Sequence, residues 1–382
     1  DRSPSRGLGD VYKRQVQLYV DQGYRLYKQD ANNTELVFDY IDEHTLPIVT
    51  HTDSRYLFGT KLLLQSILNN YTSGRLKFYI TYISTDLTLT EIESFKRYFA
   101  NESVDIHFVT SPDLEEFVKS GEFEQYSARV NEYFNQAELD PSLIPNSKCL
   151  CKMWIHDSVP EDRVIFIDSD TFLFGNIKYI FNYKLQRPFA AAHDPWPVGY
   201  TMHGVPFENE KTKDINFFHA ENLSLDYQPY FNTGVFITSL DYWRTNKFHE
   251  RAKEFMANTI ILYGDQDILN SLFSYNFDVL PLHYNAQWKS LEKDHGVIPY
   301  ELGRPYTPLV VHFNGAFKPM IGQWMYLIGD HPILLAYNRL RRQVSVKQMY
   351  LDYLGREPDN EGLNSYVDSR MLLHEIENNI KN

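Results

Sequence analysis

Cysteine is nearly absent from this chain: only two of its 382 residues, Cys149 and Cys151, are cysteines. A single residue separates them, and no second pair of this kind exists to complete a zinc site. Two cysteines also cannot form the disulfide framework that stabilises small secreted domains. We therefore expect two buried thiols on a helix, in a protein of a reducing compartment.

Long apolar runs and basic clusters are absent as well. No apolar stretch approaches the roughly 18 residues that a membrane span needs, and no signal peptide is visible, so we expect no transmembrane segment. The net charge is −13, whereas binding to nucleic acid needs a basic face that releases counterions. Nucleic acid is therefore excluded as a partner. The apolar content of 43% and the aromatic content of 15% predict a sizeable core.

Sequence patterns divide the chain into four segments. Residues 1–15 resemble translated adapter sequence, and we give them no role in the fold. Strand-like runs in residues 16–43 predict a hairpin, which we interpret as the remnant of an upstream β segment. Residues 44–335 make up the main domain. Residues 343–382 are helical and polar, and we expect a small helical module that is truncated.

Strand and helix patterns alternate from residue 46 to residue 109. Apolar residues 46–50 predict a strand, and residues 59–70 have apolar positions at helical spacing. Thr90 and Glu93 fit a capping box for a helix over residues 92–99. This alternation predicts a parallel sheet wound as in nucleotide-binding domains. No glycine-rich phosphate loop follows the first strand, so phosphate must be held in another way.

Two carboxylates follow the apolar run at residues 164–167, in the sequence Asp168-Ser169-Asp170. Such a run is typical of a strand buried on both faces of a sheet, and open α/β sheets bind ligands where their strands end. Two carboxylates separated by one residue can bind a hard divalent cation. A solvated strand end is the alternative interpretation of the triplet.

Other strand patterns also end in polar residues. His312 ends one of them, and Lys318 follows in a loop that contains Gly315. This combination would suit a diphosphate with its cation, because imidazole binds metal, lysine binds phosphate and glycine permits close approach. A structural histidine and a surface lysine are the alternatives. Four further polar residues stand at strand ends or at the start of a helix: Asp194, Asn232, Asp265 and Gln266.

Four motifs occur in the order found in glycosyltransferase family 8. They are Phe166-Ile-Asp-Ser-Asp170, Tyr230-Phe-Asn-Thr-Gly-Val-Phe236, Gly264-Asp-Gln-Asp-Ile-Leu-Asn270 and Val311-His-Phe-Asn-Gly-Ala-Phe-Lys-Pro319. The resemblance extends over about residues 46–323. The family includes bacterial lipopolysaccharide galactosyl- and glucosyltransferases and glycogenin. It implies an α/β fold of the GT-A type, a Rossmann-like mixed sheet flanked by helices, together with a UDP-sugar donor, Mn²⁺ (or Mg²⁺) and retention of anomeric configuration.

The resemblance also implies roles for individual residues. Its metal ligands correspond to Asp168, Asp170 and His312. Its contacts with the uridine and the diphosphate correspond to His51, Asp53, Tyr56, Lys152, Gly315 and Lys318, with Lys152 one position away from the usual basic residue. Its donor-sugar and acceptor region corresponds to Asp194, Asn232, Asp265 and Gln266. The chain departs from the family at Arg55 and Met320, where asparagine and tryptophan are common.

The resemblance therefore implies a retaining hexosyltransferase that moves glucose or galactose from a UDP-sugar to a glycan, a lipid-linked glycan or another cell-surface acceptor. We expect it in the cytoplasm, at the inner face of the membrane. Because the amide of Gln266 is a poor nucleophile, front-face attack is the expected route. A UDP-sugar hydrolase and a non-catalytic sugar-nucleotide-binding protein are the alternatives. Residues 350–363 resemble the core of a short bacterial helical domain of unknown function.

Overall fold

The computed structural model describes residues 25–29, 36–39, 45–71, 74–136, 147–194, 230–258, 264–273, 276–288, 300–301, 304–305, 308–314, 318–319 and 332–381. The predicted adapter segment, residues 1–15, lies outside these described residues, and so do Gly315 and Met320. None of the described helices is both long enough and apolar enough to cross a membrane.

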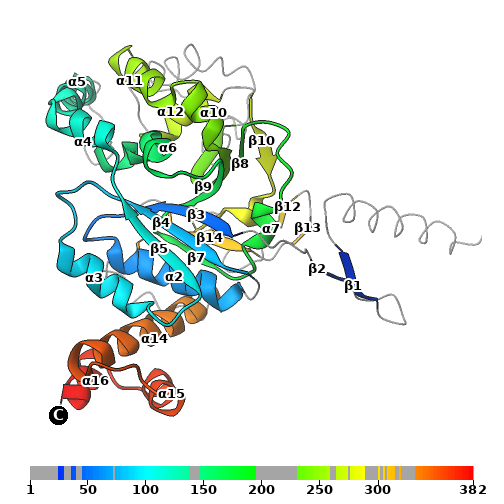
Figure 1. The fold of residues 1–382 in the computed structure, drawn as a ribbon, viewed down its shortest axis with the longest axis vertical. Helices are drawn as coiled ribbons and strands as arrows, with labels where there is room; N and C mark the ends of the chain where they lie inside the picture. Colours follow the sequence, from blue (N-terminus) through cyan, green and yellow to red (C-terminus); the bar gives the residue numbers. More distant parts are fainter. Residues whose placement is uncertain are drawn as a thin grey trace, which may run out of the picture.

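A seven-stranded mixed sheet forms the centre of the molecule (Figure 1). Its strands, in spatial order, are β10 (Asp278–Leu280), β8 (Phe189–His193), β9 (Phe231–Ser239), β6 (Arg163–Ile167), β3 (Leu46–His51), β4 (Leu76–Thr81) and β5 (Val104–Val109). Strands β6, β3, β4 and β5 run parallel, as the alternation predicted. Strand β9 runs antiparallel to both of its neighbours. The sheet is therefore mixed, which confirms the fold class that the family resemblance implied.

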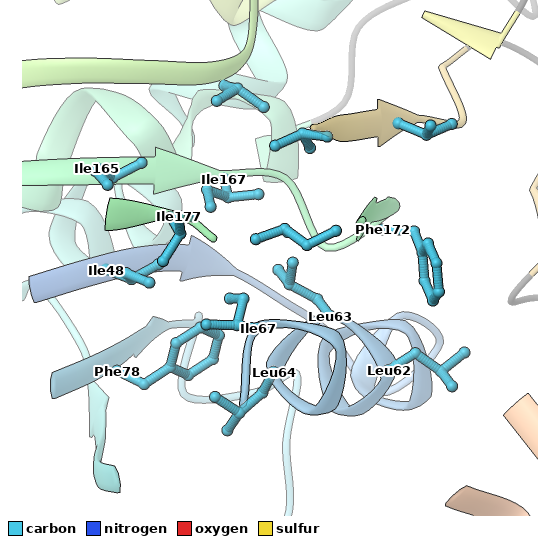
Figure 2. Packing of buried hydrophobic residues seen from close by; sticks show 14 of the residues in the cluster. Ile48, Leu62, Leu63, Leu64, Ile67, Phe78, Ile165, Ile167, Phe172 and Ile177 are labelled. Carbon is cyan, nitrogen blue, oxygen red and sulfur yellow. The ribbon is translucent and has the colours of Figure 1, made fainter. Parts of the chain in front are cut away.

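The two faces of this sheet are covered by two separate cores, because side chains alternate along each strand. On one face, Ile48 of β3 and Ile165 of β6 pack toward α2 (Leu57–Asn70), as Figure 2 shows. On the other face, Val49 and Phe166 belong to a second buried cluster. A strand that is apolar at every position is therefore explained by burial on both sides.

Helices form a layer on each side of the sheet (Figure 1). On the side of the first core lie α2, α3 (Leu89–Tyr98) and α14 (Pro332–Leu354). On the other side lie α4 (Pro112–Lys119), α5 (Glu122–Gln136), the 3₁₀ segment η2 (Ser147–Trp154), α6 (Ile155–Ser158), α10 (Leu240–Thr245), α11 (Phe248–Asn258) and α12 (Asp265–Leu272). Cys151 lies in η2 as a buried free thiol, which agrees with the prediction for that cysteine.

Smaller elements complete the fold. Strands β1 (Arg25–Gln29) and β2 (Leu36–Asp39) pair antiparallel and confirm the predicted hairpin. A second, three-stranded sheet has the order β11 (Ala286–Gln287), β14 (Val310–His312), β7 (Thr171–Leu173). The remaining short elements are α7 (Lys178–Phe181), η3 (Leu282–Tyr284), β12 (Tyr300–Glu301) and β13 (Arg304–Pro305).

The predicted capping box of α3 was wrong by two residues. Thr88, not Thr90, is the N-cap: the Glu91 backbone N–H donates to Thr88 Oγ1 at 3.3 Å, and the Thr88 N–H donates to Glu91 Oε2 at 2.8 Å. The sequence offers the Thr-x-x-Glu pattern twice, two residues apart. The earlier cap prevails because it extends the helix, and so its backbone hydrogen bonds, by half a turn.

Helix α14 passes without a break through the predicted boundary at residues 335–343. Its first half contributes Leu334 and Tyr337 to the main core. Its second half contributes Val346 to a small cluster with α16 (Leu373–Lys381), and α15 (Asn360–Asp368) packs beside it. One helix therefore serves both the sheet domain and the C-terminal helices, and the division of the chain into these units stays a prediction.

Candidate active site

Three strands of the large sheet bring their polar ends to one edge. Because β9 runs against β6 and β8, its first residues lie beside the last residues of those two strands. The Asp168 N–H donates to the Gly234 carbonyl at 2.8 Å, and the Asp194 N–H donates to the Tyr230 carbonyl at 2.8 Å. Backbone pairing alone therefore places two of the predicted carboxylates next to the start of β9.

Asp168, Asp170 and His312 form a compact cluster at this edge. One ligand atom of each residue lies within 4.8 Å of the others. His312 Nε2 is 3.3 Å from Asp170 Oδ1 and 3.8 Å from Asp168 Oδ2. The small sheet delivers the histidine, since β14 pairs with β7 directly after Asp170, and the Phe313 N–H donates to the Asp170 carbonyl at 3.0 Å. The structure thus brings the three predicted metal ligands together.

This cluster fits a divalent cation. Asp170 Oδ1 is buried and accepts no hydrogen bond of good geometry from the described residues. A buried carboxylate oxygen without such a partner is costly unless a positive charge compensates it. Two carboxylates and one imidazole are ligands that suit Mn²⁺ and similar ions. Asp168, Asp170 and His312 could therefore hold the ion that the family resemblance implies.

The surroundings shift the pKa values of the two carboxyls in opposite directions. Burial raises the pKa of Asp168 to about 6, although the Lys152 ammonium opposes the rise. Burial would raise the pKa of Asp170 too, but Lys318 and His312 hold it well below its usual range. Asp170 is therefore the carboxylate that the Lys318 ammonium stabilises in its ionised form.

Asn285 and Gly234 fix the orientation of His312. His312 Nδ1 lies 3.2 Å from Asn285 Oδ1, while Asn285 Nδ2 donates to Asn232 Oδ1 at 2.8 Å. An amide oxygen only accepts, so the proton is on Nδ1 and the Nε2 lone pair faces the carboxylates. Gly234 leaves room for the ring, because a Cβ atom at this position would lie 2.1 Å from His312 Cε1.

Lys152 is buried beside the cluster and donates to three oxygen atoms. Its Nζ lies 3.1 Å from Asp168 Oδ2, 2.8 Å from Asp265 Oδ2 and 3.2 Å from the Thr233 carbonyl. Burial would lower the pKa of Lys152, but the two carboxylates hold it above its usual range. An ammonium has three N–H donors, so these partners account for all of them. In this structure Lys152 positions Asp168 and Asp265, and its contact with a diphosphate stays a prediction.

The four residues predicted for the sugar region lie in one buried network. Gln266 Nε2 donates to Asp194 Oδ2 at 2.9 Å, and Asn232 Nδ2 donates to Gln266 Oε1 at 2.9 Å. Asn232 Nδ2 also lies 3.2 Å from Asp194 Oδ2. Asp265 joins through Thr233, whose Oγ1 donates to Asp265 Oδ2 at 2.6 Å. Helix α12 and strand β9 together build this part of the site.

The loop after β3, predicted to bind uridine, is held by Asp53. This buried carboxylate accepts from the Tyr56 N–H at 3.0 Å and from Arg55 Nη2 at 3.1 Å. Arg55, which departs from the family, therefore binds within the loop itself. Burial raises the pKa of Tyr56, and the nearby Lys318 ammonium opposes the rise. His51 is the last residue of β3, directly before this loop, and its Nδ1 lies 3.2 Å from Thr81 Oγ1.

Lys318 follows β14 and reaches back to the carboxylate cluster. It forms an ion pair with Asp170, and its Nζ donates to the Phe313 carbonyl at 2.9 Å. Burial would lower the pKa of Lys318, but Asp170 holds it above the usual value. Lys318 is thus a cation beside the cluster, as expected of a phosphate-binding lysine, while Gly315 of the same loop lies outside the described residues.

Comparison with known proteins identifies the family. A sequence profile described as Glycosyl transferase family 8 matches residues 47–321, more than half of the chain. The chain belongs to glycosyltransferase family 8. Lipopolysaccharide glucosyltransferase WaaO of Escherichia coli strain K12 is 21% identical over 376 residues, which cover 91% of this family 8 chain and 93% of WaaO. Glycosyltransferase GlyB of Streptococcus pneumoniae serotype 4 is 25% identical over 193 residues, covering 44% of this chain and 37% of GlyB. The chain thus spans less than half the length of GlyB.

A solved structure of another glycosyltransferase shares the fold. Galactosyltransferase LgtC, in complex with donor and acceptor sugar analogs, matches with a TM-score of 0.58 at 14% sequence identity. The match covers 78% of this family 8 chain and 95% of LgtC. The similarity shows the fold, and it confirms the predicted GT-A architecture.

Two polar residues of this family 8 site, Asn285 and Thr233, were not predicted from the sequence. Asn285 follows η3 in a segment without a motif, and only its distant partners His312 and Asn232 give it a place in the site. The structural role of Gly234 had a local signal, since a glycine inside an apolar strand marks a close approach of another group.

Proposed function

We propose that this family 8 chain transfers a hexose, glucose or galactose, from a UDP-sugar to a glycan or lipid-linked glycan of the cell surface. Transfer would use Mn²⁺ or Mg²⁺ and retain the anomeric configuration, and it would take place in the cytoplasm at the inner face of the membrane. The names of the relatives support the class of substrate, since WaaO is a lipopolysaccharide glucosyltransferase and LgtC a galactosyltransferase.

The observation that carries this proposal is the cluster of Asp168, Asp170 and His312 within 4.8 Å. It lies where β6 and β14 end, at the sheet edge where open α/β sheets bind ligands. The buried Asp170 Oδ1 supports a cation there. When bound, such an ion supplies positive charge that stabilises a departing diphosphate.

The protein's own groups would divide the remaining work. Lys318, whose raised pKa keeps it cationic, would stabilise negative charge that develops on the leaving oxygen. Asp194 and Asp265 would position sugar hydroxyls. Gln266 Oε1 already accepts from Asn232 Nδ2 and lies 3.3 Å from the Thr233 N–H, which makes this amide oxygen a still weaker nucleophile. The arrangement supports front-face attack over a covalent intermediate on Gln266.

The test is UDP release from a panel of UDP-sugars, with Mn²⁺ and with chelator, in the presence of truncated lipopolysaccharide cores as acceptor. We expect metal-dependent release from one donor, a glycosylated core of the matching mass, and a product linkage of the same anomeric configuration. Asp170→Ala should lower the rate about 100-fold or more, since several kcal/mol of charge stabilisation depend on the ion. Asp105→Asn is the matched control. Asp105 lies on the edge strand β5, where it forms an ion pair with Arg75 and belongs to no part of the candidate site.

Each alternative has its own outcome in this assay. Release of UDP at the same rate without acceptor, and free hexose as the product, would identify a hydrolase. Tight binding of UDP with Mn²⁺ but no release from any donor would identify a binding protein. A chain whose UDP release is unaffected by chelator and by Asp170→Ala would contradict the proposed metal site.

A further inference from the structure

A second group of side chains that could hold a metal ion lies among the helices on the side of the sheet that α6 and α11 cover. It consists of His156 and Asp157 of α6 and His249 of α11, each of which offers one ligand atom within 4.8 Å of the others. The group shares no residue with the site at the strand ends. We propose that it binds a zinc ion, which fastens α11 to α6.

The distances within this group match those that a tetrahedral ion imposes. His156 Nε2 lies 3.0 Å from His249 Nδ1 and 3.1 Å from Asp157 Oδ1, and His249 Nδ1 lies 3.7 Å from Asp157 Oδ1. Tetrahedral ligands at zinc–nitrogen and zinc–oxygen distances are about 3.3 Å apart. The three atoms therefore form one triangular face of a tetrahedron of the right size. Two imidazoles and one carboxylate are also a ligand set that zinc accepts.

Neighbouring residues support the ligands as in many metal sites. His249 Nε2, the ring nitrogen that points away from the group, lies 3.4 Å from Asp113 Oδ2, so a carboxylate can fix the ring and leave Nδ1 as the ligand. Ser111 Oγ donates to Asp157 Oδ2 at 3.0 Å, which leaves Oδ1 facing the histidines. Ser111 is also the N-cap of α4, so the support for the group extends to a third helix.

The group is largely shielded from water. The side chain of His156 is only 2% exposed, and those of Asp157 and His249 are 17% and 18% exposed. Polar side chains in such a place gain from a common partner, which a metal ion would supply. Arg244 directs its Nε to the His156 carbonyl at 3.1 Å, on the backbone side of the group.

The location gives the ion a structural role. His156 follows Lys152 by four residues, and Lys152 holds Asp168 and Asp265 of the candidate active site. An ion at this group would join α11 and α6 next to the segment that positions Lys152. The zinc site does not depend on the proposed transferase function, and its test uses metal binding instead of turnover.

The test uses Co²⁺, whose visible absorption reports tetrahedral coordination, on the full chain without an affinity tag. The background variant Asp170→Asn disables the cluster at the strand ends. In this background we expect one Co²⁺ per chain, with tetrahedral bands that Zn²⁺ removes by competition, and a rise of several degrees in melting temperature when Zn²⁺ is added. A further His249→Phe substitution keeps a ring against His156 and should abolish the bands. The matched control His107→Phe changes an exposed histidine that stacks on Tyr79 and should keep them.

Two results would overturn the proposal. One is the absence of tetrahedral bands in the Asp170→Asn background, which would leave His156 and His249 as a hydrogen-bonded pair. The other is the persistence of the bands after His249→Phe. If that variant does not fold by circular dichroism, Asp157→Asn, which can still accept from Ser111, replaces it: loss of the bands supports the site and their retention overturns it.

Discussion

At the scale of single residues, His312 is held by two neighbours that would touch no substrate. Asn285 binds its Nδ1, and Gly234 leaves the space that its ring occupies. Both neighbours come from segments that are distant in the sequence. The candidate metal ligand is therefore positioned by packing and hydrogen bonding, which makes these two neighbours informative targets for mutation.

Asn285→Ala should weaken the binding of Mn²⁺ about 10- to 100-fold, because His312 loses the partner that selects its tautomer and orientation. Titration of the purified protein with Mn²⁺, followed by electron paramagnetic resonance, measures this directly. Asn285→Asp is the conservative partner: it keeps an acceptor for Nδ1 and should recover most of the affinity. Equal affinity of wild type and Asn285→Ala would show that His312 needs no such support.

Gly234→Ala should impair both metal binding and stability. The new Cβ would meet the His312 ring at 2.1 Å, so the imidazole must move away from Asp170, and we expect a loss of roughly 1–3 kcal/mol in the free energy of unfolding. Gly175→Ala is the control, since its Cβ would meet only the flexible Leu309 side chain at 3.2 Å. Denaturant unfolding and Mn²⁺ titration of both variants measure these effects. A Gly234→Ala variant with the same stability and the same Mn²⁺ affinity as Gly175→Ala would contradict the packing argument.

At the scale of elements, α2 is covered by α14, which comes almost 300 residues later. Lys61 of α2 is 7% exposed in this contact, and its Nζ donates to Gln348 Oε1 of α14 at 2.5 Å. The ammonium also lies 4.9 Å from the centre of the Tyr98 ring. These partners compensate only part of the cost of burying a charge, since burial lowers the pKa of Lys61 to about 8.

Lys61→Met should stabilise the protein at neutral pH by about 1–3 kcal/mol, because the buried charge disappears while the apolar stem remains. The folded pKa of Lys61, about 8, is below the unfolded value of 10.5, so between these values the unfolded chain binds more protons. The wild type therefore gains stability from this residue as pH rises from about 8 to 10.5, and the advantage of methionine shrinks over the same range. Urea unfolding of both proteins at pH 7, 9 and 10 measures this difference in stability.

Lys96→Met on the exposed surface of α3 is the control, for which we expect a change within about 0.5 kcal/mol at every pH. An advantage of Lys61→Met that does not vary between pH 7 and pH 10 would show that the charge of Lys61 is not the cause.

The elements also show what local sequence can and cannot predict. Strands β3 and β6 were predictable because a short apolar run bounded by polar residues is typical of a strand buried in a sheet. The reversed direction of β9 was not contained in its own pattern, since an apolar strand looks alike in a parallel and an antiparallel setting; only the family resemblance implied a mixed sheet. The cap of α3 was ambiguous for a similar reason, because Thr88 and Thr90 present the same local pattern.

At the scale of the whole molecule, sequence motifs predicted the carboxylates and the histidine of the candidate site. They did not predict the residues that hold these side chains in place. Asp168 and His312 are 144 positions apart, and each stands in a motif that could be compared with a family. Asn285 contacts β9 and β14, whereas Thr233 contacts η2 and α12, and no single stretch of sequence specifies these pairings. Tertiary pairing was therefore the part that sequence patterns could not supply.

Two truncations should have different effects, because α14 belongs to two cores. Removal of residues 355–382 exposes Val346, which packs against α16, to solvent. We expect the free energy of unfolding to fall by roughly 2–4 kcal/mol and unfolding to remain cooperative. Removal of residues 332–382 also takes Leu334, Tyr337 and Leu340 out of the main core, and this chain should not fold. Circular dichroism and thermal unfolding compare the two. A folded product of the longer deletion would show that α14 is dispensable for the sheet domain.

The contact between α2 and α14 has a consequence for biosynthesis. Lys61 and its partner Gln348 are 287 positions apart, so the ribosome must add 287 residues after Lys61 before this partner is made. At typical rates of translation this interval lasts roughly 15–60 s. During that time the side of α2 that faces α14 has no permanent partner, and the nascent chain presents a binding surface for chaperones. The packing of α2 is thus coupled to the synthesis of a segment that follows it by almost 300 residues.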